Sequence, residues 1–320
     1  MTMAQHVITV VGATGNQGGG LARAILSDPG GQFSVRAVTR NRHSTQAKRL
    51  AAGGAEVVEA DLYDVAGMQR AFEGAEAAFV VTNYWAERTA EEEAVRTRAE
   101  SELYQAETAA RAAKSAGVAH VIWSTLEDTR DHFGDDARVP TVEGRYKVPH
   151  FDAKAEADAA FAEHGVPTTF LRTAGFYEGF LSDLQPVRDP SGHLVLTLPM
   201  ADRPMAAIAV GDIGRTALGI FKRGPEFIGQ TVSIAGDHLT GDEFAAELSR
   251  LHGEPVAYRP QSWNELRAMG FPGAVEMGNM FQFYAEDSER FTAARDLAFV
   301  RTLNPDLLSF HDWVARQNAA

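Results

Sequence analysis

Short apolar runs recur at regular intervals through the first half of the chain. They are rich in Val, Ile, Ala and Phe and lack the regular polar alternation of a half-exposed strand, so they predict β-strands covered on both faces. The six predicted strands are residues 6–11, 33–39, 55–60, 77–81, 118–123 and 167–171.

Helical stretches separate these runs. The predicted helices cover residues 18–27, 44–53, 65–72, 91–115 and 151–163. A repeated strand–helix–strand order gives a parallel sheet with right-handed crossovers. The sequence therefore predicts an α/β fold of the Rossmann type, a doubly wound parallel sheet, with a smaller C-terminal α/β lobe.

The pattern loosens after Arg172. Short strands are expected at residues 194–198 and 231–235, a helix at 212–221 with Asp212 as its N-cap, and a terminal helix at 306–317. Capping boxes, which begin helices, are predicted at Thr240 with Glu243 and at Ser262 with Glu265. We expect a Rossmann domain over residues 1–172 and a smaller lobe over 173–320 that is partly interleaved with the sheet.

Charge and composition exclude several classes of function. The 320 residues include 30 Lys and Arg against 43 Asp and Glu, for a formal net charge of −13, which argues against a surface for nucleic acid or for an anionic membrane. The chain has no Cys, which excludes disulfides, thiolate nucleophiles, Cys-ligated zinc and iron–sulfur clusters. Its 10 His show no paired spacing, so no metal site is indicated.

Segments that would direct the chain to a membrane are not apparent. The N-terminus lacks the cationic and apolar regions of a signal peptide. No apolar run approaches the roughly 18 residues that a membrane span needs. We therefore expect a soluble, cytoplasmic protein.

The first predicted strand leads into the segment Gly12-Ala13-Thr14-Gly15-Asn16-Gln17-Gly18. In a dinucleotide-binding turn the first glycine permits the tight bend, the second allows the backbone close to a pyrophosphate, and the third lets the helix lie near the strand. The helix N-terminus adds N–H groups for the anion. Because this segment follows a strand and begins a helix, it predicts an NAD(P)-binding domain.

The end of the second strand indicates which dinucleotide would bind. NAD-specific sites usually place a carboxylate there for the ribose 2′-hydroxyl, but this strand ends in Val38-Thr39-Arg40-Asn41. The Arg40 guanidinium suits a 2′-phosphate, so NADP(H) is favoured over NAD(H). The alternative is that Arg40 is an ordinary surface residue.

Polar residues also follow the third and fourth strands. Asp61-Leu62 stands where an adenine contact is expected, and Thr82-Asn83-Tyr84-Trp85 stands beside the expected ribose and pyrophosphate. Ligands of open parallel sheets bind at these carboxyl ends of strands. Each of these residues could equally cap a helix or fill a crevice.

Several segments together resemble the NmrA-like family of atypical short-chain dehydrogenase/reductase proteins. They include the glycine turn, Val38–Asn41 and Val81–Trp85, and also His150-Phe151-Asp152-Ala153-Lys154, Phe271-Pro272-Gly273-Ala274 and Asn279-Met280-Phe281-Gln282-Phe283-Tyr284-Ala285. The resemblance covers nearly the whole chain. It is greatest to the NADPH-sensing redox sensors of the HSCARG type.

The resemblance implies NADP bound in a cleft between a Rossmann lobe and a smaller lobe. The cofactor would contact Gly12, Ala13, Thr14, Gly15, Asn16, Gln17, Gly18, Arg40, Asn41, Asp61, Leu62, Thr82, Asn83, Tyr84 and Lys154. Phe176, Tyr177, Glu178 and Gly179 would close over its nicotinamide end. Residues 86–100 are longer than the family's usual connection. The candidates for a basic family residue at the start of the next helix are Arg96 and Arg98, or else Tyr104 occupies its position.

The proton-transfer residues depart from the classical enzymes. Those enzymes use Tyr-x-x-x-Lys on one helix, where the Tyr passes the proton. Here His150 stands four residues before Lys154, and Tyr146 is eight residues before it. The candidate catalytic residues are therefore Lys154, as a general base or only as a ribose ligand, and His150, as a proton donor or a structural residue.

Two functions follow from this departure. The leading hypothesis is an NADP(H)-binding redox sensor or regulator with weak or no dehydrogenase activity, with a regulatory protein partner or a second copy of the chain as its partner. The alternative is an NADPH-dependent reductase of a small carbonyl, quinone or enone-like substrate that uses Lys154 or His150.

Overall fold

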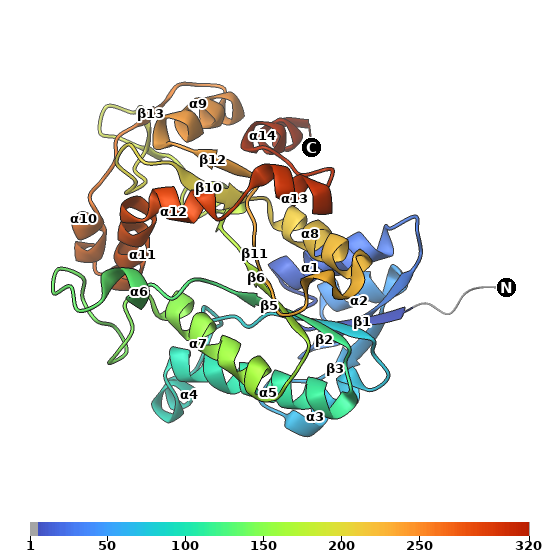
Figure 1. Ribbon diagram of the computed structural model, residues 1–320. Helices are drawn as coiled ribbons and strands as arrows, with labels where there is room; N and C mark the ends of the chain where they lie inside the picture. The colour runs from blue at the N-terminus through green and yellow to red at the C-terminus, as the bar shows by residue number, and fades with distance from the viewer. Residues whose placement is uncertain (1–5, 320) are drawn as a thin grey trace. The chain divides into compact units, whose positions relative to one another are not determined.

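A computed structural model describes residues 6–319 and confirms the predicted α/β fold. The chain forms two compact units (Figure 1). The first contains the described residues through Asp128, His150–Arg172 and Ile213–Val232, and the second contains Thr129–Pro149, Thr173–Asp212 and the described residues from Ser233 onward. Residues 129–149 and 213–232 are thus grouped differently from a single division after residue 172.

A seven-stranded sheet forms the centre of the first unit, in the order β11-β6-β5-β4-β1-β2-β3. β1 lies between β2 and β4 and pairs with both in parallel. The strand order reverses between β1 and β4, and ligands of doubly wound sheets bind at such a reversal. The strands are β1 (His6–Val10), β2 (Phe33–Thr39), β3 (Glu56–Glu59), β4 (Ala77–Val80), β5 (His120–Thr125), β6 (Thr168–Arg172) and β11 (Thr231–Ser233).

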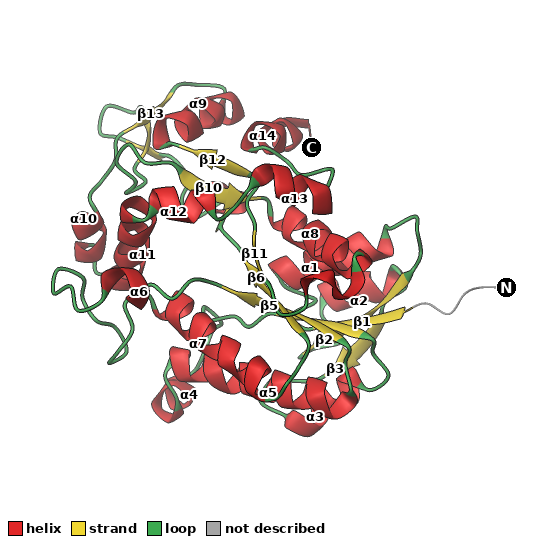
Figure 2. Ribbon diagram, in the orientation of Figure 1, coloured by secondary structure: helices red, strands yellow, loops and turns green. Residues whose placement is uncertain are grey.

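Helices cover both faces of this sheet (Figure 2). On one face lie α3 (Val65–Phe72), α5 (Arg98–Ala116) and α7 (Pro149–Glu163), which share one buried core with the strands. On the other lie α1 (Asn16–Leu26), α2 (Thr45–Ala52) and the part of α8 (Val210–Lys222) in the first unit. α1 and α8 touch through their backbones, because a Cβ on Gly214 would overlap the carbonyl carbon of Gly20.

The single helix predicted over residues 91–115 is wrong. The structure has α4 (Ala90–Val95) and then α5, with Arg96 between them in an extended conformation. The Thr97 side chain accepts a hydrogen bond from the Glu100 N–H, which begins a new helix and so ends the old one. A second capping box, at Thr89, begins α4.

Asp212 is not the N-cap of its helix, contrary to the prediction. α8 begins at Val210, and the Asp212 carboxylate accepts hydrogen bonds from Asn304 Nδ2 at 2.6 Å and from the Leu308 N–H at 3.1 Å. Its role is therefore to hold the chain near residues 304–308 within the second unit.

The second unit contains two three-stranded sheets, β12-β10-β7 and β13-β9-β8. Their strands are β7 (Gly175–Phe176), β8 (Val187–Arg188), β9 (Leu194–Leu196), β10 (Met205–Ile208), β12 (Asp237–Leu239) and β13 (Val256–Tyr258). The helices are α6 (Arg130–Phe133), α9 (Gly241–His252), α10 (Trp263–Ala268), α11 (Ala274–Glu286), α12 (Ser288–Ala293), α13 (Leu297–Leu303) and α14 (Phe310–Ala319). The predicted capping boxes at Thr240 and Ser262 are confirmed. Over residues 6–319, no helix combines the length and the apolar character required to cross a membrane.

Candidate functional site

Glycine is required at one position in the turn between β1 and α1 and at one position in the first turn of α1. Gly12 has a φ of +72°, which disfavours any side chain, and a Cβ there would lie 2.9 Å from Val81 Cγ1. A Cβ on Gly18 would lie 2.5 Å from the Gly12 carbonyl oxygen. The backbone of the turn therefore lies directly against the first turn of the helix.

Gly15 differs from these two glycines, because its own backbone does not need a glycine. It is the exposed N-cap of α1 with φ −91° and ψ −170°, and a Cβ would lie 3.3 Å from the Gly12 oxygen. No side chain caps the helix at this position. The N–H groups of the first turn of α1 are thus open to an anion, which fits a pyrophosphate.

A polar contact links this turn to the end of β5. The Ser124 hydroxyl donates a hydrogen bond to Gln17 Oε1 at 2.7 Å. Ser124 is buried and Gln17 lies in the first turn of α1. This contact fixes the helix N-terminus to the carboxyl edge of the sheet.

Arg40, at the end of β2, is exposed. Among residues 6–319 its side chain makes no hydrogen bond or ion pair, so the guanidinium is available to a ligand. The neighbouring polar side chains shape turns instead. Asn41 Oδ1 accepts from the His43 N–H, and Asp61 Oδ1 accepts from the Tyr63 N–H, both at 2.9 Å.

Lys154 forms a buried ion pair with Glu102. The Lys154 ammonium donates to Glu102 Oε2 at 2.6 Å, to Thr82 Oγ1 at 2.5 Å and to the Thr82 carbonyl oxygen at 3.3 Å. The Lys154 side chain is 10% exposed and that of Glu102 only 1%. All three N–H groups of the ammonium therefore have acceptors within the protein, and the Glu102 carboxylate is its counterion.

Glu102 was missed by the sequence analysis, although its carboxylate is the counterion of Lys154. The structure brings Thr82, at the end of β4, together with Lys154 on α7, as both were expected to belong to one site. Glu102 joins them from α5, the second helix after β4 along the chain.

His150 belongs to a cluster of aromatic rings. Its imidazole centroid lies 5.8 Å from the ring of Tyr84, 5.3 Å from that of Trp85 and 4.9 Å from that of Phe151. His150 is 9% exposed. The expected proton donor and the residues after β4 thus come together, one helical turn before Lys154.

Asp158 lies one further turn along α7. The Trp123 indole N–H donates to its carboxylate at 2.8 Å, and Lys154 Nζ lies 5.5 Å from the centroid of the same indole. Burial raises the pKa of Asp158 from 3.8 to about 6, although hydrogen bonds from Thr125 and Trp123 act in the opposite direction. Asp158 is therefore the carboxyl in this group of residues whose pKa is raised, to about 6.

We expect the replacement Asp158→Asn to change the pH dependence of stability. Because the folded state has the higher pKa, it binds more protons than the unfolded state between about pH 4 and pH 6, so this carboxyl loses stabilising effect as the pH rises through that range. Asn at position 158 can still accept the Trp123 hydrogen bond but does not titrate. The stability of the wild-type protein relative to the variant should therefore fall between these pH values in urea unfolding.

The pH dependence of stability must be compared between wild type and variant, because His120 has the opposite effect on it from Asp158. Burial lowers the pKa of His120 to about 4, so its effect on stability rises over the same range in both proteins. A difference between wild type and variant that does not change with pH would contradict the assignment.

Residues 176–179 belong to the second unit and are engaged there. The Glu178 carboxylate accepts hydrogen bonds from the Val210 N–H at 3.0 and 3.2 Å, and burial raises the pKa of Glu178. The fully buried Tyr177 donates to the Leu308 carbonyl oxygen at 3.4 Å, and burial raises its pKa well above the usual range. Their contact with a cofactor stays a prediction.

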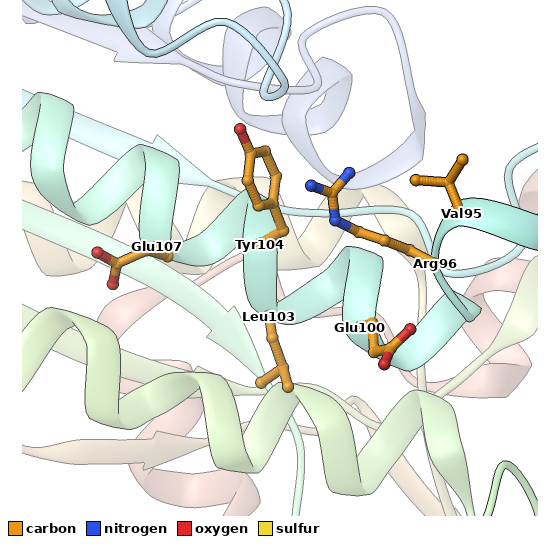
Figure 3. Close-up of a pocket in the computed structure, with 6 residues that line it drawn as sticks. All are labelled: Val95, Arg96, Glu100, Leu103, Tyr104 and Glu107. Atoms are coloured by element: carbon orange, nitrogen blue, oxygen red, sulfur yellow. The ribbon is translucent and has the colours of Figure 1, made fainter. Parts of the chain in front are cut away.

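An open surface pocket of about 510 Å³ lies along α4 and α5 (Figure 3). The Arg96 guanidinium lies 4.2 Å from the centroid of the Tyr104 ring, and Tyr104 stacks on Tyr63 with centroids 5.7 Å apart. Figure 3 shows Leu103 pointing to the opposite side of α5. Arg98 is not among the residues that line this pocket. Its guanidinium donates hydrogen bonds to the carbonyl oxygens of Tyr84 and Ala86. The lining residues are Val95, Arg96, Glu100, Leu103, Tyr104 and Glu107.

Solved structures share this fold over nearly the full chain. The negative transcriptional regulator NmrA in complex with NADP is 22% identical, with a TM-score of 0.75 and coverage of 98% of this chain and 97% of that one. The triphenylmethane reductase of Citrobacter sp. with NADP(H) is 20% identical, with a TM-score of 0.72 over 98% and 99%. The quinone oxidoreductase QOR2 of Escherichia coli with NADPH is 22% identical, with a TM-score of 0.68 over 97% and 99%.

Curated relatives match by sequence over most of their length. The oxidoreductase hkm9 of Aspergillus hancockii is 29% identical over 92% of this chain and 90% of its own. The oxidoreductase himF of Aspergillus japonicus is 31% identical over 89% and 86%. Both are described as NmrA-like family domain-containing proteins. The model of the NmrA-like family matches residues 4–300, and the chain therefore belongs to the NmrA-like family.

Proposed function

We propose that the chain binds NADP(H) at the carboxyl ends of β1, β2 and β4 and acts as an NADPH-dependent oxidoreductase. The observation that carries this proposal is the uncapped N-terminus of α1 beside a glycine turn, with the charged Lys154 on the same sheet edge. The bound cofactor would supply a hydride. The pyrophosphate would be held by Gly12–Gly18, the adenine by Asp61 and Leu62, and the ribose of nicotinamide by Lys154 with Thr82, Asn83 and Tyr84.

The preference for NADP(H) rests on the end of β2. Arg40 supplies an unpaired guanidinium there, with Asn41 next to it. The carboxylate on the adjacent strand end, that of Glu59, accepts a hydrogen bond from the Arg42 N–H at 3.2 Å. The 2′-phosphate of NADP(H) would therefore lie beside the Arg40 guanidinium, whereas the Glu59 carboxylate is occupied by a backbone hydrogen bond.

The replacement Arg40→Ala should reduce the preference for NADP(H) over NAD(H) by about tenfold or more, because a charge-assisted hydrogen bond contributes about 1.5–3 kcal/mol. Calorimetric titration with both dinucleotides measures the preference. Arg49→Ala, which removes an exposed cation from α2, is the control and should leave the preference unchanged. Equal affinities of the wild-type protein for the two dinucleotides would refute the assignment.

The type of substrate follows from the proton-transfer residues. The charged Lys154 is unsuited to take a proton, and His150 replaces the classical Tyr. This arrangement favours an acceptor that becomes a stabilised anion on receiving a hydride, since such an anion takes its proton from water or from His150 without a strong acid. Quinones and conjugated enones are acceptors of this kind. The sequence relative hkm9 is named an oxidoreductase, and one solved structure with the same fold is named a quinone oxidoreductase, which supports this choice.

The test is NADPH oxidation measured with a panel of quinones, enones and aldehydes. Turnover with quinones or enones, absent in a Gly15→Val variant that cannot bind the cofactor, is the expected result. A panel with no turnover by a protein that binds NADPH would refute the oxidoreductase function and leave the cofactor site standing.

A redox sensor of the HSCARG type is the second candidate function. It is favoured by the three hydrogen bonds that hold Lys154 and by the absence of Tyr at position 150. A sensor must respond differently to the two redox states of the cofactor. Different stabilisation by NADPH and NADP⁺ in thermal unfolding, together with no turnover across the panel, would favour this function.

A further inference from the structure

Trp85 is an exposed aromatic side chain held in place by buried ones. Trp85 is 47% exposed, whereas its neighbours Tyr84 and His150 are only 5% and 9% exposed. The Tyr84 ring meets the indole edge to face, with centroids 5.0 Å apart at 79°, and the His150 ring lies 5.3 Å away at 57°. The indole is thus supported on one side and open on another.

The backbone around Trp85 is also fixed. The Trp85 N–H donates to Asn83 Oδ1 at 3.1 Å, in a turn that follows β4. Arg98 donates to the carbonyl oxygens on both sides, those of Tyr84 at 2.8 Å and Ala86 at 2.9 Å. A ring that is already immobilised loses little conformational entropy when a ligand stacks on it.

This exposure sets Trp85 apart from two other Trp residues of the chain. Trp123 is 0% and Trp313 is 3% exposed, and both contribute to buried cores. Leaving a large apolar ring in water forgoes the stability that its burial would bring. A rigid, open indole is nevertheless useful if a planar ligand covers it.

We propose that Trp85 is the stacking surface for the ring of the substrate, and that the substrate class is a planar aromatic quinone. This inference rests on the proposed function and narrows it. The position agrees with the chemistry, because His150, the residue in the place of the classical proton donor, lies beside the same indole. A quinone stacked on Trp85 would have the imidazole ring of His150 next to its edge.

The reaction balances without a further reagent. Bound NADPH would supply one hydride, which carries two electrons and one proton, to the quinone. A second proton comes from solvent or through His150, so that the products are the hydroquinone and NADP⁺. Small aliphatic carbonyl compounds offer no ring to stack and should use Trp85 little.

Binding is tested with menadione as the probe and with NADP⁺ present, so that no turnover occurs. Because the energy of an aromatic pair beyond its buried area is about 0.5–1.5 kcal/mol, Trp85→Leu should raise the Kd by about two- to tenfold. Trp85→Phe keeps an aromatic ring and should change it less. The control is Trp263→Leu, which removes a partly exposed indole of α10 in the second unit and should leave the Kd unchanged.

Steady-state rates separate this inference from the proposed function. With NADPH saturating, Trp85→Leu should raise the KM for menadione by the same factor while the KM for an aliphatic diketone stays unchanged. An unchanged Kd and KM for menadione in Trp85→Leu would overturn the stacking role even if turnover is intact. If menadione binds through Trp85 but no variant, nor the wild type, oxidises NADPH, the stacking role stands and the reductase function fails.

Discussion

Replacing Glu102 by Gln is expected to lower the free energy of unfolding by about 3–5 kcal/mol, the usual effect of removing one partner of a buried ion pair. The Glu102 side chain is 1% exposed and its carboxylate is 2.6 Å from Lys154 Nζ. The amide of Gln has a similar shape but no charge, so the Lys154 ammonium would remain buried without a counterion. Urea unfolding followed by circular dichroism measures the change.

Glu107 on the same helix provides the matched control. Its side chain is 42% exposed and pairs with His164 at 2.8 Å. Glu107→Gln should therefore cost less than about 1 kcal/mol, because even a fully charged exposed pair contributes no more than that. Equal losses of stability in the two variants would show that the Lys154–Glu102 pair is not the buried, dehydrated contact described above.

The second large effect is expected from Gly15→Val, which should abolish binding of NADPH while the protein remains folded. The backbone angles of Gly15 suit any residue, and a Cβ meets only the Gly12 oxygen at 3.3 Å, so a small adjustment accommodates the side chain. The isopropyl group would instead occupy the space in front of the α1 N-terminus, where a pyrophosphate needs close approach to the backbone. Calorimetric titration and the thermal shift with NADPH both report binding.

Two other glycines make the result specific. Gly30→Val places the same side chain at an exposed glycine near Asp28, in the loop before β2, and should leave binding unchanged. Gly18→Ala should lower the melting temperature even without cofactor, because its Cβ would lie 2.5 Å from the Gly12 oxygen. A normal thermal shift of Gly15→Val with NADPH would place the cofactor elsewhere.

The strands and helices of the first unit could largely be predicted because their patterns are local. β2 over residues 33–39 and α3 over residues 65–72 have the predicted bounds. The break between α4 and α5 was missed within a run of Ala and Glu that is helical on both sides. Its signal is nonetheless local, since Thr97 and Glu100 have the spacing of a capping box.

The charge at Glu102 could in part have been recognised from the sequence. Ala99, Ala106 and Ala109 share the buried face of α5, and Glu102 falls at the same helical spacing. A lone carboxylate on an apolar face indicates a buried partner. Its identity could not be predicted, because Lys154 is 52 residues away and meets Glu102 only once α5 and α7 lie on the same face of the sheet.

The arrangement of α1 against α8 has a consequence for the order in which the chain can fold during synthesis. Gly20 emerges from the ribosome long before Gly214, so the face of α1 that α8 later covers stays bare in the meantime. The edge of β6 likewise waits for β11. Contacts between segments that are far apart in the sequence form slowly, and the exposed edge of an unfinished β-sheet promotes aggregation. A nascent chain that stalled at Arg172 would therefore present an unfinished sheet. The first unit is complete only after residues 173–212, which belong to the second unit, and then Ile213–Val232 have been made.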